Sequence, residues 1–271
     1  TGNEGYEYCN QSTQCVADCL GIEKSSVLVA STGVIGMQLP MDRIANGIKM
    51  LSESLEDTIE AGTKAAQAIM TTDTVAKECE VEIDLSGKAV KIGACCKGSG
   101  MIHPNMATML VFITTDVAIA PELLQKALST DIASTFNMVS VDGDTSTNDM
   151  VSVMANGMAG NAIIDSEGAD YDAFCEALSG VTSYLCRMIA GDGEGATKLL
   201  ECSVSGASTE AVAKTVAKSV VCSSLTKAAM FGADANWGRV LCAIGYSGAK
   251  VDVSKVSVSF SSKKGDILVC K

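Results

Sequence analysis

Apolar residues recur with the period of an α-helix in several parts of the chain. The clearest pattern covers residues 170–190, where Phe174, Leu178 and Leu185 share one helical face. Proline at position 121 and at position 40 marks the start of two further patterns, because proline is well tolerated in the first helical turn. The predicted helices are 41–51, 55–70, 121–136, 170–190, 208–220 and 240–244, with a weaker one inside residues 1–20.

Short apolar runs bounded by turn residues predict strands between these helices. Residues 80–85 and 88–94 are separated only by Ser86-Gly87 and should form a hairpin. Residues 109–113 have the composition of a buried inner strand. The other predicted strands are 26–31, 138–141, 197–204, 256–260 and 266–270. Helices interleaved with strands predict an α/β fold, a layered sandwich with mixed sheets between helices.

One threonine stands where a loop meets a strand. A loop rich in glycine, residues 98–107, leads into the apolar run, and Thr108 lies at the junction, so the strand could begin at Thr108 itself. A hydroxyl in this position could attack the carbonyl of Ala107 and release a new N-terminal threonine. Its α-amine, with an ordinary pKa of about 7.7–8.0, would then act as its own base. Most threonines that open a strand have no such role, so both interpretations stay open.

Three other polar segments are ambiguous. Residues 142–149 alternate like a calcium loop, but Val153 occupies the twelfth position, so we predict a turn that caps a following helix. Residues 191–195 read G-x-G-x-G after a helix and before a strand, the reverse of a dinucleotide site, and leave Glu194 as a loop carboxylate. The Thr32-Gly33 pair follows a predicted strand and offers either a plain turn or backbone N–H groups for an oxyanion.

Composition narrows the classes of function. The net charge of −12 and the absence of a Lys/Arg cluster argue against a nucleic-acid partner, and no run of eighteen apolar residues predicts a membrane span. The twelve cysteines are scattered through apolar faces, so we predict reduced thiols and a cytosolic location. There is no C-x-x-C and His103 is the only histidine, so no metal site is expected.

Four stretches carry a resemblance to a known family. The segment KGSGMIHPNMATML at 97–110 resembles the signature of the ornithine acetyltransferases, the glutamate N-acetyltransferases and N-acetylglutamate synthases of arginine biosynthesis. Residues 27–44, 140–151 and 236–248 are also similar to the family pattern. The resemblance covers nearly the whole chain, although the family pattern is expected to extend beyond both ends. It implies a self-processing fold of the N-terminal-nucleophile type.

The resemblance also implies roles for particular residues. The chain would be cut between Ala107 and Thr108 into an α-segment, 1–107, and a β-segment, 108–271, which assemble as a heterotetramer of two α and two β chains. An acetyl group would pass from N-acetylornithine, and possibly from acetyl-CoA, to glutamate through Thr108, with no other cofactor. The implied oxyanion hole is Thr32 and Gly33, and the implied substrate contacts are Thr71, Lys97, Thr108 and Glu194.

Two other functions remain open at this stage. An amidohydrolase or aminopeptidase of the same self-processing type would pass the acyl group to water, and a fragment or binding protein would not be processed at all. His103 is a weaker candidate for a general base, because it lies between Ile102 and Pro104 and the amine of a cleaved Thr108 already supplies a base. The sequence does not decide whether acetyl-CoA is used.

Overall fold

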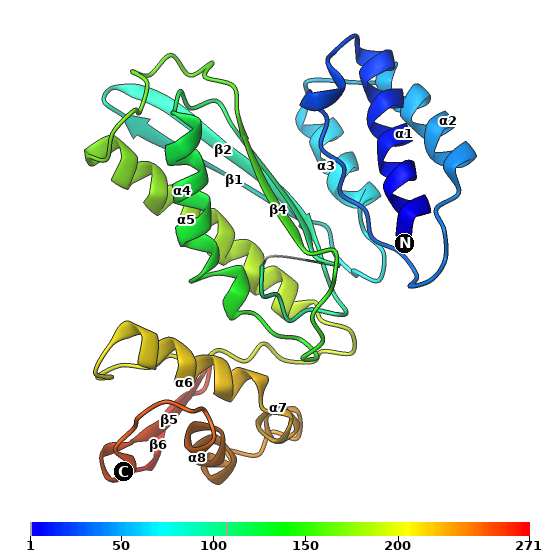
Figure 1. Ribbon diagram of the computed structural model, residues 1–271. Coiled ribbons are helices and arrows are strands. Elements are labelled where there is room, and N and C mark those ends of the chain that lie inside the picture. The colour runs from blue at the N-terminus through cyan, green and yellow to red at the C-terminus, as the bar shows by residue number, and fades with distance from the viewer. Residues whose placement is uncertain (1, 107) are drawn as a thin grey trace.

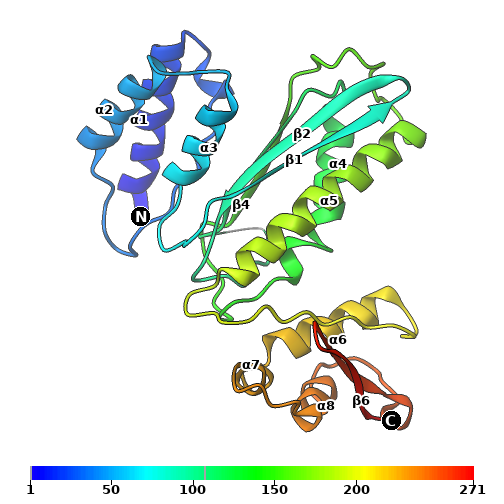
Figure 2. The same cartoon turned by 180° about the vertical axis from the view of Figure 1, so that it is seen from behind.

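The computed structural model describes residues 2–106 and 108–271, and their helices and strands gather in three groups. Figure 1 shows the N-terminal helices on one side of a central sheet and a C-terminal group below it. The view from behind separates the same three groups (Figure 2). The predicted α/β class is therefore confirmed.

The N-terminal group consists of helices. Thr58 begins the third of them, because its hydroxyl accepts a hydrogen bond from the N–H of Ala61. The elements are α1 (Gly2–Leu20), the 3-10 turn η1 (Lys24–Ser26), α2 (Met41–Ser52) and α3 (Ile59–Ala68).

The central sheet has four strands in the order β1-β2-β3-β4. They are β1 (Lys77–Leu85), β2 (Lys88–Lys97), β3 (Leu110–Thr115) and β4 (Met150–Ala155). The first three strands pair antiparallel, whereas β3 and β4 pair parallel. The predicted hairpin joins β1 to β2, and Ser86 and Gly87 both have positive φ, at 51° and 84°. This is the two-residue turn whose twist suits a hairpin.

Two helices, α4 (Pro121–Ile132) and α5 (Ala169–Gly191), cover one face of this sheet. The apolar face predicted for α5 is confirmed, because Phe174, Leu178 and Leu185 are fully buried. They pack with strand residues such as Ile92 and Ile113 in a core made mainly of aliphatic side chains. The short turn η2 (Phe136–Met138) follows α4.

The C-terminal group has a small core of its own. Val216 and Val220 of one helix, Val240 and Ile244 of another, and Val258 of a strand are buried together. The elements are α6 (Glu210–Cys222), α7 (Ser224–Phe231), α8 (Trp237–Gly245), the 3-10 turn η3 (Val253–Lys255), and the antiparallel pair β5 (Val258–Ser262) and β6 (Gly265–Cys270).

Several predicted strands are wrong. Residues 26–31 form no strand, and Leu28 is 71% exposed. Residues 138–141 and 197–204 are also outside the strands of the described chain. In contrast, strand β4 follows the polar turn 142–149, where we predicted a helix. A short apolar run is equally compatible with a strand or a packed loop, and a parallel strand depends on a partner distant in sequence.

Buried ion pairs join the start of β1 to the end of α5. The Nζ atom of Lys77 lies 2.7 Å from Asp73 Oδ1 and 2.6 Å from Asp192 Oδ2. The side chains of Lys77 and Asp73 are fully buried, and that of Asp192 is 9% exposed. Asp192 also accepts hydrogen bonds from the N–H and the hydroxyl of Thr74. The carboxylates therefore have strong partners that compensate for the loss of water.

No helix among residues 2–106 and 108–271 is both long and apolar enough to cross a membrane.

Replacing Lys77 by methionine should destabilise the fold strongly. Lys77→Met leaves two carboxylates buried without their cation, so we expect a loss of about 3–5 kcal/mol in the free energy of unfolding. Lys91→Met, which removes an exposed pair with Glu82 at 3.9 Å, is the control and should cost less than about 1 kcal/mol. Urea unfolding at neutral pH measures both. Equal, small effects would contradict a structural role for the buried cluster.

The same cluster should make the free energy of unfolding depend on pH. Burial by itself would raise the pKa values of Asp73 and Asp192, but hydrogen bonds, first of all from Lys77, lower both below the ordinary value. Their contribution is thus present above the unfolded pKa of about 3.9 and is lost as the pH falls through the folded values. The stability difference between wild type and Lys77→Met should narrow as the pH falls from about 7 to about 3. A stability difference that stays constant over this pH range would argue against a contribution from the ionised Asp73 and Asp192.

Candidate active site

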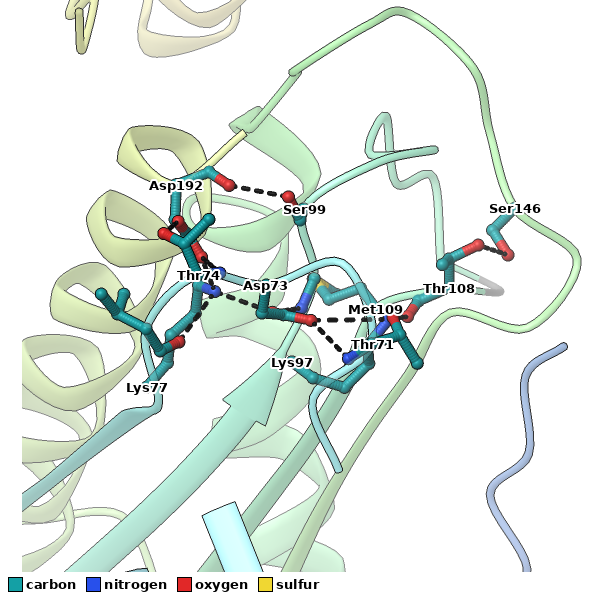
Figure 3. A network of polar contacts seen from close by, with 12 residues as sticks. Thr71, Asp73, Thr74, Lys77, Lys97, Ser99, Thr108, Met109, Ser146 and Asp192 are labelled. Atoms are coloured by element: carbon teal, nitrogen blue, oxygen red, sulfur yellow. Dashed lines mark hydrogen bonds and ion pairs between the residues drawn. The ribbon is translucent and has the colours of Figure 1, made fainter. Parts of the chain in front are cut away.

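The candidate site lies at one end of the central sheet, where the ends of all four strands meet. The pairings Lys97 with Leu110 and Leu110 with Met150 place the end of β2 beside the starts of β3 and β4. The start of β1 lies at the same end, because Lys77 pairs with Cys96. The loops 98–106 and 142–149 and the polar turn 71–74 therefore meet here, as Figure 3 shows for the side chains that they carry.

Thr108 is held at three of its atoms. Its hydroxyl donates to Ser146 Oγ at 2.9 Å, its backbone N–H donates to Asp149 Oδ1 at 2.7 Å, and its carbonyl accepts from Lys97 Nζ at 3.2 Å. Strand β3 begins two residues later, at Leu110, so the prediction that the strand begins at Thr108 is wrong. The N–H of Thr108 is bonded to a side chain instead of the sheet ladder.

Asp149 joins the threonine to the start of β4. Its Oδ1 also accepts the N–H of Met109, at 2.9 Å, so a single oxygen holds two successive backbone groups. Its Oδ2 is buried and has no hydrogen-bond partner among the described residues. From the sequence alone, Asp149 and Ser146 are turn residues without an assigned role. The alternation of polar residues over 142–149 was the only signal of either.

Lys97 lies beneath the threonine. It is 1% exposed, and besides the Thr108 carbonyl its Nζ atom lies 4.0 Å from Asp73 Oδ2. Burial lowers the pKa of Lys97 below its ordinary value, and the neighbouring Asp73 opposes this effect. A cation is therefore present next to Thr108, as a substrate carboxylate would require. Whether it contacts substrate remains a prediction.

Thr71 reaches the site through Asp73. The N–H of Thr71 donates to Asp73 Oδ2 at 3.2 Å, and the N–H of Gly98 donates to Oδ1 at 2.7 Å. Asp73 thus connects the predicted contact Thr71, which is exposed, to the end of β2 and to Lys97 (Figure 3). The sequence gives no signal for Asp73, because a carboxylate in a polar helix end usually faces solvent.

Glu194 lies against the loop that precedes Thr108. Its N–H donates to the carbonyl of Ser99 at 3.1 Å. A Cβ added to Gly100 would lie 2.5 Å from Oε1 of Glu194, so only glycine fits at position 100 without moving the carboxylate. Glu194 also lines a cavity of about 320 Å³ together with Thr197, Lys198, Lys227 and Phe231. The structure therefore brings Glu194 to the Thr108 loop, as its predicted substrate role requires.

Thr32 and Gly33 approach the site indirectly. Asn148 donates from its side chain to the carbonyl of Ser31 at 2.9 Å and from its backbone N–H to Ser146 Oγ at 3.0 Å. The residue before Thr32 is therefore linked through Asn148 and Ser146 to the hydroxyl of Thr108. Thr32 is half-buried and Gly33 exposed, in a loop rather than after a strand. Their oxyanion role stays a prediction.

His103 is engaged elsewhere. Its Nδ1 lies 3.0 Å from Ser140 Oγ and 3.7 Å from Cys222 Sγ, and no hydrogen bond within the described chain joins it to Thr108. Burial lowers the pKa of His103 below its ordinary value, and Lys218 and Lys227 act in the same direction. This geometry does not favour His103 as a base. The other partner in the expected cleavage, Ala107, lies outside the described residues.

Residues 2–106 and 108–271 contain no group of three or more His, Cys, Asp or Glu side chains arranged to hold an ion.

Comparison with known proteins gives a consistent result. The model of the ArgJ family matches residues 1–271. The arginine biosynthesis bifunctional protein ArgJ 1 of Clostridium acetobutylicum is 53% identical over 270 residues, covering 100% of this chain and 66% of that protein. Its counterpart from Caldanaerobacter subterraneus is 50% identical over 271 residues, covering 100% of this chain and 67% of that protein. This chain thus spans about two thirds of the length of these curated relatives.

A solved structure agrees with the sequence comparisons. The crystal structure of the arginine biosynthesis bifunctional protein ArgJ from Bacillus halodurans is similar with a TM-score of 0.54 and 52% identity, over 55% of this chain and 70% of that chain. A fold likeness at this identity, together with a family match along the whole chain, confirms the resemblance found in the four sequence stretches. The chain belongs to the ArgJ family.

Proposed function

We propose that the protein is an acetyltransferase that moves an acetyl group from N-acetylornithine to glutamate through an acetyl-Thr108 intermediate. The observation that carries the proposal is the setting of Thr108, whose hydroxyl bonds to Ser146 and whose N–H bonds to Asp149, directly above the buried cation Lys97. The names of the relatives, bifunctional proteins of arginine biosynthesis, agree with this substrate class.

Processing creates the catalytic amine. The Thr108 hydroxyl attacks the carbonyl of Ala107, the peptide C–N bond breaks, and an ester to Oγ forms. Water hydrolyses the ester to the carboxylate of Ala107 and a free α-amine on Thr108. The products are the segments 1–107 and 108–271, which we propose assemble as two α and two β chains.

The amine then serves both halves of the reaction. It takes the proton from Oγ as the hydroxyl attacks the acetyl carbonyl, and it returns the proton to the amine of the departing ornithine. Glutamate enters with a neutral amine that attacks the acetyl ester and breaks the acyl C–Oγ bond. The Thr108 amine carries the proton from the attacking nitrogen to Oγ, and N-acetylglutamate leaves. Backbone donors at Thr32 and Gly33 would stabilise the oxyanion in each step. Acetyl-CoA would enter as an alternative donor in a bifunctional enzyme.

Charge complementarity supports the substrate class. Both N-acetylornithine and glutamate carry an α-carboxylate, and a chain with a net charge of −12 needs a local cation to bind them. Lys97 is that cation, Thr71 is linked to it through Asp73, and Glu194 offers a carboxylate to a substrate ammonium group. The twelve cysteines are all free thiols, which supports a cytosolic location.

Removing the hydroxyl of Thr108 should abolish both cleavage and transfer. Thr108→Ala is expected to stay one chain and to be inactive, whereas Thr108→Ser keeps Oγ and should cleave and turn over more slowly. The Ala variant should lose only on the order of 1 kcal/mol of stability. Thr114→Ala in β3, which removes an exposed threonine hydroxyl, is the control and should behave as wild type. Intact mass and N-acetylglutamate formation measure the two outcomes.

Two results would overturn the assignment. Cutting of Thr108→Ala between residues 107 and 108, or acetyl transfer by that variant, would mean that another nucleophile acts. In the wild type, free acetate formed from N-acetylornithine at the same rate with and without glutamate would identify a hydrolase instead of a transferase.

Gly100→Ala should weaken substrate binding without preventing cleavage. The new methyl group would displace the Glu194 carboxylate, so KM for N-acetylornithine should rise about tenfold or more, the usual effect of losing a hydrogen bond to a charged group. Gly180→Ala in α5, where a Cβ meets nothing within 4 Å, is the matched control. An unchanged KM in Gly100→Ala would remove Glu194 from the substrate contacts.

A further inference from the structure

The two carboxylate oxygens of Asp149 differ in their hydrogen bonding. Oδ1 accepts the N–H groups of Thr108 at 2.7 Å and of Met109 at 2.9 Å. Oδ2 is buried and unpartnered among the described residues. A buried carboxylate oxygen without a donor is unfavourable, and such exceptions in a folded protein call for a functional explanation.

The number of hydrogens on the Thr108 nitrogen explains why Oδ2 of Asp149 has no donor. As a peptide nitrogen it has a single hydrogen, which Oδ1 already accepts. After the bond to residue 107 is cut, the same nitrogen carries two hydrogens as an amine and three as an ammonium. A second N–H then becomes available within reach of the carboxylate that already holds the first. The free oxygen therefore fits the processed chain better than the uncut one.

We propose that Asp149 is the positioning residue that binds the Thr108 α-ammonium with both carboxylate oxygens and holds the amine beside Oγ. This inference rests on the proposed function, because it requires the cleavage. It also gives a reason for the free oxygen before cleavage, since releasing the amine supplies the missing donor. Asp149 thereby favours the cut form and orients the base for catalysis.

The charged groups around the Thr108 α-amine determine its pKa. Asp149 faces it from the start of β4 and favours the ammonium form. Lys97 faces it from the end of β2 and disfavours that form, while Asp73 and Glu194 lie near enough to Lys97 to offset its charge, to which Lys77 adds. Removing the charge of Asp149 alone should therefore lower the pKa of the amine.

The test is the pH profile of Asp149→Asn. Asparagine is close in shape and keeps an oxygen for the two N–H groups, but it loses the charge and presents an amide N–H₂ to the ammonium. We expect kcat to fall about tenfold or more and the acid limb of kcat/KM to move to lower pH by about one unit. Asp144→Asn, at an exposed position in the same loop, is the matched control and should leave both unchanged.

The results with the Asp149 variants separate the proposed role of Asp149 from the proposed function. A cut, folded Asp149→Asn with a wild-type acid limb overturns the proposal even if kcat falls, because a purely structural role would not move the limb. If this variant stays uncut, Asp149→Glu decides, since a carboxylate at a different distance should still permit cleavage but shift the limb. A wild-type limb there also overturns the proposal. An uncut or inactive wild type would instead refute the proposed function itself.

Discussion

The carboxylate of Asp73 is the group on which the arrangement of the site depends. It accepts hydrogen bonds from Lys77 and from the N–H groups of Thr71 and Gly98, and it lies 4.0 Å from Lys97. Together with Asp192, it balances two buried lysines with two carboxylates. A single buried cluster therefore ties the start of β1, the end of β2 and the end of α5 to one another. It costs desolvation energy that only complete pairing offsets.

Sheet topology places the reactive groups above this cluster. The β1–β2 hairpin returns the chain to the end where it began, and the parallel return of β4 brings Asp149 beside Thr108. The loops that carry Ser146 and Ser99 then lie next to one another without being close in sequence. The site thus consists of loops on a rigid frame, a common way to combine precise positions with varied chemistry.

Hydrogen bonds across the site connect it to the N-terminal group. Asn148 links the carbonyl of Ser31 to Ser146, which holds the Thr108 hydroxyl. In the proposed mechanism the residues after Ser31 would supply the oxyanion donors. This places the nucleophile and the expected oxyanion donors in segments more than seventy residues apart, on the two sides of the expected cleavage.

The sequence by itself determined the long helices, the β1–β2 hairpin, the inner strand after Thr108 and, through local motifs, the family. These features rest on periodicity, turn chemistry and contiguous residues, all of which are local. Tertiary structure decided that residues 26–31 form no strand and that Met150–Ala155 forms one, because strand pairing depends on distant partners. It also decided the importance of Asp73 and Asp149. A carboxylate in a polar turn is usually solvated. Only folding shows that Asp73 is buried against Lys77 and that Asp149 holds the Thr108 nitrogen while its Oδ2 is buried.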